Sequence, residues 1–178
     1  SYMTVENGVI RSVGSMASLT QEQKQGAVDL SGKTVMPGMF NCHIHALSSP
    51  IAAPESLNWE TSGMFALRGL RHLQQLLQSG VTFVRDMNGR KLAEVDLKNA
   101  LNQGLFVGPN YYIARQCLCM TGGHGCNTGR ECDGAVDCKR AAREQIKGGA
   151  DFVKIMATGG VNSDTRPEFS QLDLEEMT

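Results

Sequence analysis

Two histidines separated by one residue form the clearest chemical pattern in this chain of 178 residues. His43 and His45 come directly after an apolar run that begins at Pro37-Gly38. Side chains on a β-strand alternate between its faces, so residues two apart project to the same side. Two neutral imidazoles on one face make half of a tetrahedral zinc site. The spacing predicts a metal site at the end of a strand, and the alternative is a pair of solvent-facing histidines.

A lysine inside an apolar run is the second chemical signal. Lys154 lies within residues 152–156, and Gly159-Gly160 follow shortly afterwards. A buried ammonium group is costly unless it is paired, deprotonated or chemically changed. Glycines at this position allow a ligand to approach the backbone closely. The residues alone leave two interpretations open: Lys154 takes part in chemistry, or it reaches the sheet edge or pairs with a carboxylate.

Three weaker signals lie where predicted strands end. His124 sits in a glycine-rich loop, Thr-Gly-Gly-His-Gly, which indicates either an unhindered functional imidazole or a simply solvated one. Arg85-Asp86 follows one predicted strand and Arg115 follows the next. We expect Arg85 and Asp86 to form a structural ion pair, and Arg115 allows the same interpretation.

The charge balance excludes several partners. The 17 Lys and Arg residues against 18 Asp and Glu give a net charge of −1. Such a chain has no basic field to hold nucleic acid or an anionic membrane. No stretch approaches the roughly 18 apolar residues that a membrane span needs. We expect a protein that uses a small-molecule or dipeptide substrate and binds neither nucleic acid nor membrane, and a homo-oligomer is compatible with this composition.

Six cysteines are present, and five of them fall between residues 117 and 138. A disulfide framework needs a secreted context, which the first residues do not indicate because they lack the pattern of a signal peptide. Zinc clusters favour Cys-x₂-Cys pairs, and these spacings differ. We therefore expect reduced thiols and a cytoplasmic location. A cysteine-based zinc module over residues 117–138 is the alternative.

The elements that must position these residues follow a repeated order. Three times after Pro37-Gly38, a helix-like stretch leads to glycine and then to a short apolar strand. Alternating strands and helices predict a parallel sheet wrapped by helices. Before that point, we expect one hairpin around Asn7-Gly8 and a second over residues 28–36. The strands expected after it are residues 39–42, 81–84, 105–107 (with a further β-prone run at 111–113) and 152–156.

Taken together, four segments resemble the metal-dependent amidohydrolase superfamily, within the branch of imidazolonepropionase-like proteins and Xaa-Pro and Xaa-Arg dipeptidases. They are found in the family's order along most of the chain. The segments are residues 35–45, 80–86, 121–125 and 152–160.

The resemblance implies a (β/α)₈ barrel of the TIM type, of which only the N-terminal half is present here. Residues 1–36 then correspond to the N-terminal part of a composite β-sandwich, and residues 37–178 to the first four β/α units. A complete barrel of this type needs roughly 250 residues, which is more than this chain has. The missing C-terminal half of the barrel becomes an implied partner.

The resemblance also assigns roles within the site. His43 and His45 match two metal ligands, and Lys154 matches a lysine that reacts with CO₂ to give a carbamate bridging two metal ions, here expected to be zinc. His124 and, more loosely, Arg115 are candidates for binding substrate. Asn41 stands where the family frequently has Asp. The general-base Asp and further histidines of the family would follow Lys154, and no His does so here, so no catalytic base is assigned.

The leading functional hypothesis is a binuclear amidohydrolase that cleaves an amide bond in a dipeptide or N-acyl amino acid. The chain would be an N-terminal fragment of it, inactive alone. The alternative is a non-catalytic half-barrel that self-associates as a binding or structural module. Residues 166–172 resemble a loop that closes over the site.

Overall fold

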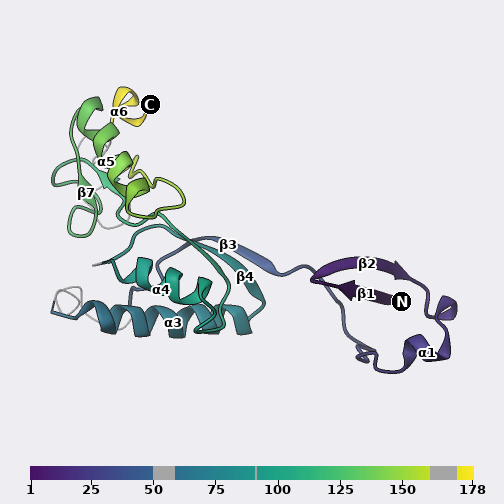
Figure 1. The fold of residues 1–178 in the computed structure, drawn as a ribbon. Coiled ribbons are helices and arrows are strands. Elements are labelled where there is room, and N and C mark those ends of the chain that lie inside the picture. The colour runs from purple at the N-terminus through teal and green to yellow at the C-terminus, as the bar shows by residue number, and fades with distance from the viewer. Residues whose placement is uncertain (50–58, 91, 161–171) are drawn as a thin grey trace. The chain divides into compact units, whose positions relative to one another are not determined.

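The computed structural model describes residues 1–49, 59–90, 92–160 and 172–178, and these form two compact units (Figure 1). The first unit is Ser1–Pro37 and the second is Gly38–Thr178. The role of the first unit in a composite β-sandwich stays a prediction. No helix in the described ranges is long and apolar enough to cross a membrane. The segment 166–172, predicted to close over the site, lies outside the described residues except for Leu172.

The first unit is built around the predicted hairpin. Strands β1 (Tyr2–Glu6) and β2 (Val9–Gly14) pair antiparallel across Asn7-Gly8, whose φ angles are both positive, at 51° and 76°. Positive φ at both central residues is what a two-residue turn of this kind requires. A 3₁₀ turn, η1 (Met16–Ser18), and a short helix, α1 (Gln21–Lys24), follow.

The predicted second hairpin over residues 28–36 is wrong, because none of these residues is in a strand. The Asp29 carboxylate accepts hydrogen bonds from the Ser31 amide at 2.8 Å and from its hydroxyl at 2.6 Å. This local turn satisfies groups that a strand ladder would otherwise use. The flanking apolar side chains stay exposed, as Val28 shows at 81%.

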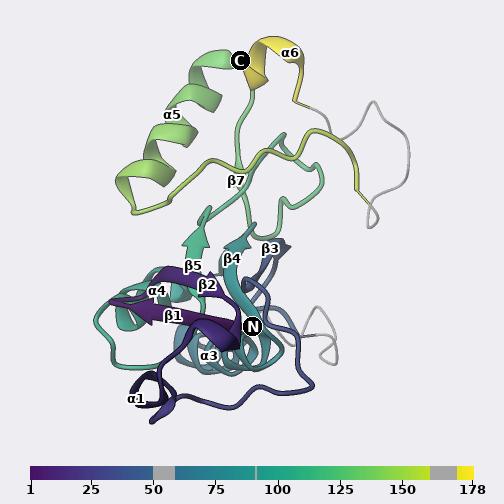
Figure 2. The ribbon, with the colours of Figure 1, turned by 90° about the vertical axis from the view of Figure 1, so that its right-hand side faces the viewer.

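The second unit begins with a three-stranded parallel sheet in the order β3-β4-β5 (Figure 2). Its strands are β3 (Met39–Ile44), β4 (Val81–Asp86) and β5 (Asn110–Ile113). Helices α3 (Ser62–Gln78) and α4 (Ala93–Asn102) cover one face. This confirms the predicted α/β class with parallel strands.

The covered face holds the larger hydrophobic core. Side chains from the helices interlock with those of the strands, and most are almost fully buried. The apolar spacing of α3 at i, i+3 and i+4 predicts this face. The core residues from the helices and strands include Phe65, Leu73, Leu97, Val84, Tyr111 and Ile113.

One predicted strand is displaced along the chain. Residues 105–107 are not in a strand and are exposed, and β5 begins at Asn110 instead. Pro109 lacks an amide hydrogen, so it favours the start of a strand rather than its interior. The apolar run at 105–107 therefore leads into β5 without joining the sheet.

The remainder of the second unit is a smaller layer. Strands β6 (Leu118–Cys119) and β7 (Arg130–Glu131) pair in parallel, and helix α5 (Ala135–Lys147) packs against them. A single turn of helix, α6 (Leu174–Met177), follows. The predicted strand at 152–156 is reduced to one bridge, Ile155 with Leu118. The sheets are therefore open, with β6 linking the Lys154 segment to the smaller layer.

Candidate functional site

His43 and His45 lie at the carboxyl end of β3, and their rings are close together. The ring centroids are 5.4 Å apart with an interplanar angle of 70°. Ile44 between them packs on the helix-covered core, so the two histidines project to the opposite, exposed face. The amide of His43 donates to the side chain of Asn41 at 3.2 Å, across the irregularity where β3 shifts its register against β4. The predicted same-face pair is present.

Lys154 is electrostatically coupled to both histidines. Partial loss of solvent lowers the pKa of the His43 ring, and the positive charges of Lys154 and Arg85 lower it further. The pKa of His45 is lowered chiefly by burial, and then by His43 and Lys154. Both shifts favour the neutral imidazole, which is the form that binds a metal ion. Lys154 is therefore near enough to both histidines for its charge to act on them.

The chain directly after His45 is anchored from two sides. The Ala46 amide donates to the buried carboxylate of Asp86 at 3.2 Å, and the Ala46 carbonyl lies 2.7 Å from Nδ1 of His72 on α3. Asp86 also accepts from the Tyr111 hydroxyl at 2.6 Å. These contacts fix the backbone that presents His45, and they connect it to β4, β5 and α3.

The predicted ion pair between Arg85 and Asp86 is wrong. Asp86 is 1% exposed and points into the helix-covered core, and its burial raises its pKa to about 6. Arg85, on the other face, lies 4.2 Å from the centroid of the Phe152 ring. Neighbouring residues of a strand point to opposite faces, so these two could not pair directly.

Asn88 ties the loop after β4 to the loop that contains His124. Its side-chain amide donates to the Thr128 hydroxyl at 2.6 Å, and its carbonyl oxygen accepts from the Cys117 amide at 3.1 Å. Its backbone also acts on the His45 ring and partly offsets the lowering of that pKa.

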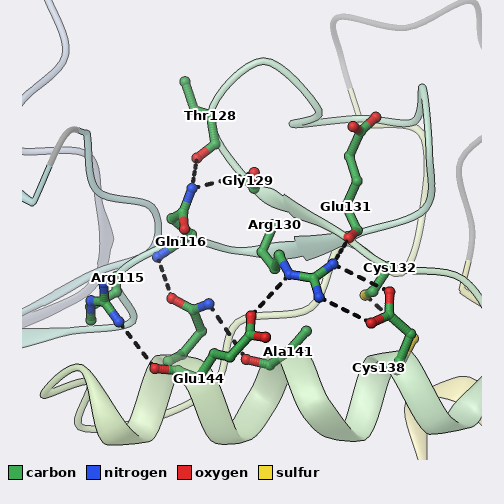
Figure 3. A network of polar contacts seen from close by, with 12 residues as sticks. Arg115, Gln116, Thr128, Gly129, Arg130, Glu131, Cys132, Cys138, Ala141 and Glu144 are labelled. Atoms are coloured by element: carbon green, nitrogen blue, oxygen red, sulfur yellow. Dashed lines mark hydrogen bonds and ion pairs between the residues drawn. The ribbon is translucent and has the colours of Figure 1, made fainter.

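The two residues predicted to bind substrate lie in different surroundings. The His124 ring lies so close to Gly160 that a Cβ there would be 2.6 Å from Nε2, which places it beside the segment after Lys154. Arg115 instead lies at the end of α5, where its guanidinium donates to the Glu144 carbonyl at 3.1 Å (Figure 3). Arg115 therefore holds a helix end in this structure, and a substrate contact for it stays a prediction.

The donor set fits the first half of a metal site. Two imidazoles on one tetrahedral ion have ring centroids about 5 Å apart, given metal–nitrogen distances of about 2.1 Å. The observed 5.4 Å separation agrees with this requirement. Within the described ranges, no group of three or more His, Cys, Asp or Glu side chains is arranged to hold a metal ion. A ligand that completed such a site would be of another kind, such as a modified Lys154, or would come from outside the described residues.

The match to known families agrees with this geometry. A profile of the Amidohydrolase family matches residues 34–175. The chain therefore belongs to the amidohydrolase family, and its fold is that of the N-terminal part of that barrel. The predicted resemblance and fold class are confirmed.

The chain is also similar to individual proteins and solved structures. The chain is 30% identical over 208 residues to ochratoxinase of Aspergillus niger, an alignment that covers 98% of this chain and 42% of that protein. The crystal structure of that ochratoxinase is similar, with a TM-score of 0.74, 27% identity and coverage of 98% of this chain and 46% of that chain. A prolidase complexed with N-methylphosphonate-L-proline matches with a TM-score of 0.71 and 35% identity, over 85% of this chain and 41% of that chain. The chain thus spans less than half the length of these relatives.

Sequence reasoning missed Asp86 and Asn88 as supports of the site. One signal for Asp86 was present, because Val84 and Asp86 are two apart on a strand and must share a face. A carboxylate that shares a face with a core valine is a buried carboxylate. No comparable signal identified Asn88, whose contacts join residues 29 and 40 positions away.

Proposed function

We propose that this chain is the N-terminal part of a binuclear, zinc-dependent amidohydrolase that cleaves an amide bond in a dipeptide or an N-acyl amino acid. The observation that carries the proposal is the pairing of the His43 and His45 rings, whose centroids are 5.4 Å apart at the carboxyl end of β3, within electrostatic reach of Lys154. The relatives support the substrate class, since they include a prolidase, a Xaa-Pro dipeptidase and an ochratoxinase.

His43 and His45 would hold one metal ion through neutral imidazoles. Lys154 would hold metal as a carbamate, formed when its neutral amine adds to CO₂ and releases a proton. The conversion replaces an ammonium group by an anionic oxygen ligand. Bound metal ions in such a site lower the pKa of water and polarise a carbonyl group.

The residues around the pair would position it. Asp86 and His72 fix the backbone after His45, and Asn88 ties the loop after β4 to the loop that contains His124. His124, half-buried beside Gly160, would bind a substrate carboxylate or carbonyl at the edge of the site. Arg115 would act at greater distance, by holding α5 against this layer.

We infer that the isolated 178-residue chain binds metal weakly and turns over no substrate. Three proposed ligands do not complete two metal sites, and the alignment reaches only 42% of the relative's length. The rest of the barrel would supply the other ligands and the general base. A stop codon directly after Thr178 in the source gene would contradict this.

The test compares the product of the full source gene with this chain on a set of Xaa-Pro dipeptides and N-acyl amino acids. We expect zinc-dependent hydrolysis by the full product and none by the chain. In the full product, Lys154→Ala should abolish turnover, whereas Lys147→Ala on α5 should leave it unchanged. Hydrolysis by the homogeneous chain alone, or by the Lys154→Ala protein, would contradict the proposal.

One observation favours a second candidate, a half-barrel that self-associates as a binding or structural module. Phe40, Phe83 and Tyr112 stack across the three strands with centroid distances of 4.9 and 4.8 Å, and Phe40 is 69% exposed. An apolar surface of this kind promotes association. Light scattering tests this candidate. A monomer near the chain mass of 19.3 kDa excludes self-association, and a dimer supports it.

A further inference from the structure

Two buried cysteines face each other in the smaller layer of the second unit. The Sγ atoms of Cys132 and Cys138 are 3.3 Å apart (Figure 3). Both side chains belong to the hydrophobic cluster beneath α5, and both residues are almost fully buried. Cys132 directly follows β7, and Cys138 lies in the first turns of α5. The thiols therefore come from two different elements that pack on each other.

Ion pairs hold those two elements together beside the thiols. Arg130 of β7 pairs with Asp137 at 3.0 Å and with Glu144 at 3.0 Å, both on α5. Arg130 is two residues before Cys132, and Asp137 is one residue before Cys138. These ion pairs therefore help to hold the two sulfurs close together.

We propose that Cys132 and Cys138 are a site of disulfide formation that links β7 to α5. A disulfide has a bond length of about 2.05 Å, so the sulfurs need to approach by little more than an ångström. The reaction is an exchange with a small-molecule disulfide such as oxidised glutathione. The two thiols lose two protons and two electrons and form one S–S bond, and the reagent's S–S bond is reduced to two thiols.

The surroundings make this exchange slow at neutral pH. Burial raises the pKa of the Cys132 thiol to about 12 and also raises the pKa of Cys138. Because the thiolate is the attacking form, little of it is present near pH 7. The site therefore suits a lasting link more than a rapid switch.

The C-terminal segment covers the pair. Leu172 is buried in the same cluster as both thiols, and the Glu176 carboxylate of α6 accepts a hydrogen bond from the Gly134 amide at 2.6 Å. Gly134 is the residue just before α5, and it lies between the two cysteines in the sequence. Opening of residues 172–178 would expose the thiols, so we expect Glu176→Ala to speed their oxidation.

The link would stabilise the layer that backs the Lys154 segment. The Leu118 amide donates to the Lys154 carbonyl at 2.8 Å, and Leu118 packs in the cluster that contains both thiols. The disulfide would close a loop with five intervening residues and so lower the entropy of the unfolded chain. We expect this to raise the melting temperature by about 5 °C.

The test compares the Cys132–Cys138 link with a control link of the same sequence spacing. Cys126 and Cys132 have the same separation of five intervening residues as Cys132 and Cys138. In denaturant, the two links should therefore form equally. We oxidise the purified chain with oxidised glutathione, in native buffer and in denaturant, and map the cross-links by peptide mass spectrometry.

We expect the native chain to form the Cys132–Cys138 link at least tenfold over Cys126–Cys132. Cys138→Ser should abolish both the link and the rise in melting temperature, and Cys126→Ser should retain both. Comparable amounts of the two links in the native chain would overturn the proposal. So would absence of the Cys132–Cys138 link after extended oxidation of the Glu176→Ala protein.

Discussion

The two faces of the β3–β4–β5 sheet differ in what surrounds them, and the residues proposed for chemistry are on only one. Helices α3 and α4 cover the first face, where Phe65 and Leu73 pack on the strands and Asp86 is buried among hydrogen-bond donors. On the second face lie the stacked Phe40, Phe83 and Tyr112, together with His43, His45 and Arg85.

The two faces of the sheet have different roles. The covered face determines stability, and through Asp86 it also fixes the backbone beside His45. The open face presents His43 and His45, the proposed metal ligands. Structural support and chemistry are thus separated by the alternation of side chains along a strand.

The largest expected effect is a loss of stability on substitution in the covered face. Phe65→Ala should lower the free energy of unfolding of the second unit by about 3–5 kcal/mol, because it leaves a cavity beneath α3. The matched change on the open face, Phe40→Ala, should cost less than about 1 kcal/mol, because that ring is 69% exposed. Urea unfolding followed by circular dichroism measures both. Equal losses would mean that the open face is buried in solution.

A smaller effect comes from the buried carboxylate. The pKa of Asp86 is raised from 3.8 to about 6 in the folded state, mainly by burial. The folded protein therefore binds more protons than the unfolded chain between these values, and stability falls as pH rises from about 4 to about 6. Over this range the ionisation of Asp86 lowers the free energy of unfolding by about 3 kcal/mol, and the loss stays constant at higher pH.

Asp86→Asn provides the control, because the amide keeps an oxygen that accepts from Ala46 and Tyr111 but does not titrate. The difference in unfolding free energy between wild type and variant should change between pH 4 and 6 and level off above. A difference that is flat with pH would show that Asp86 is not buried as described.

The smallest expected effect is on the open face. Arg85→Ala removes the guanidinium above the Phe152 ring and should cost about 0.5–1 kcal/mol. Arg85→Lys should retain part of this energy. Urea unfolding of the two variants measures it, and a loss above 2 kcal/mol would indicate that Arg85 is buried by something other than Phe152.

Elements with a local signal could be predicted from the sequence. The Asn7-Gly8 hairpin, helix α3 and strand β4 all lie where turn chemistry and apolar spacing place them. The His-x-His pair also lies on one face, as the alternation requires. These features depend on residues a few positions apart.

Elements that depend on a distant partner could not be predicted. Residues 28–36 have the composition of a hairpin, but they pair with no strand among the described residues, and only a local turn at Asp29 forms. Residues 152–156 have the composition of a strand, and their pairing is limited to the bridge with Leu118. The supports of the site, Asp86 and Asn88, likewise act through contacts made by tertiary packing.

The measurement that tests the account most directly is the zinc bound per chain, determined by plasma mass spectrometry after equilibration against buffered zinc. We compare the wild-type chain with the His43→Ala/His45→Ala double variant and with Cys42→Ala, which removes the neighbouring thiol. We expect weak zinc binding that disappears in the double variant and persists in Cys42→Ala. Zinc retained at the wild-type level by the double variant would contradict it.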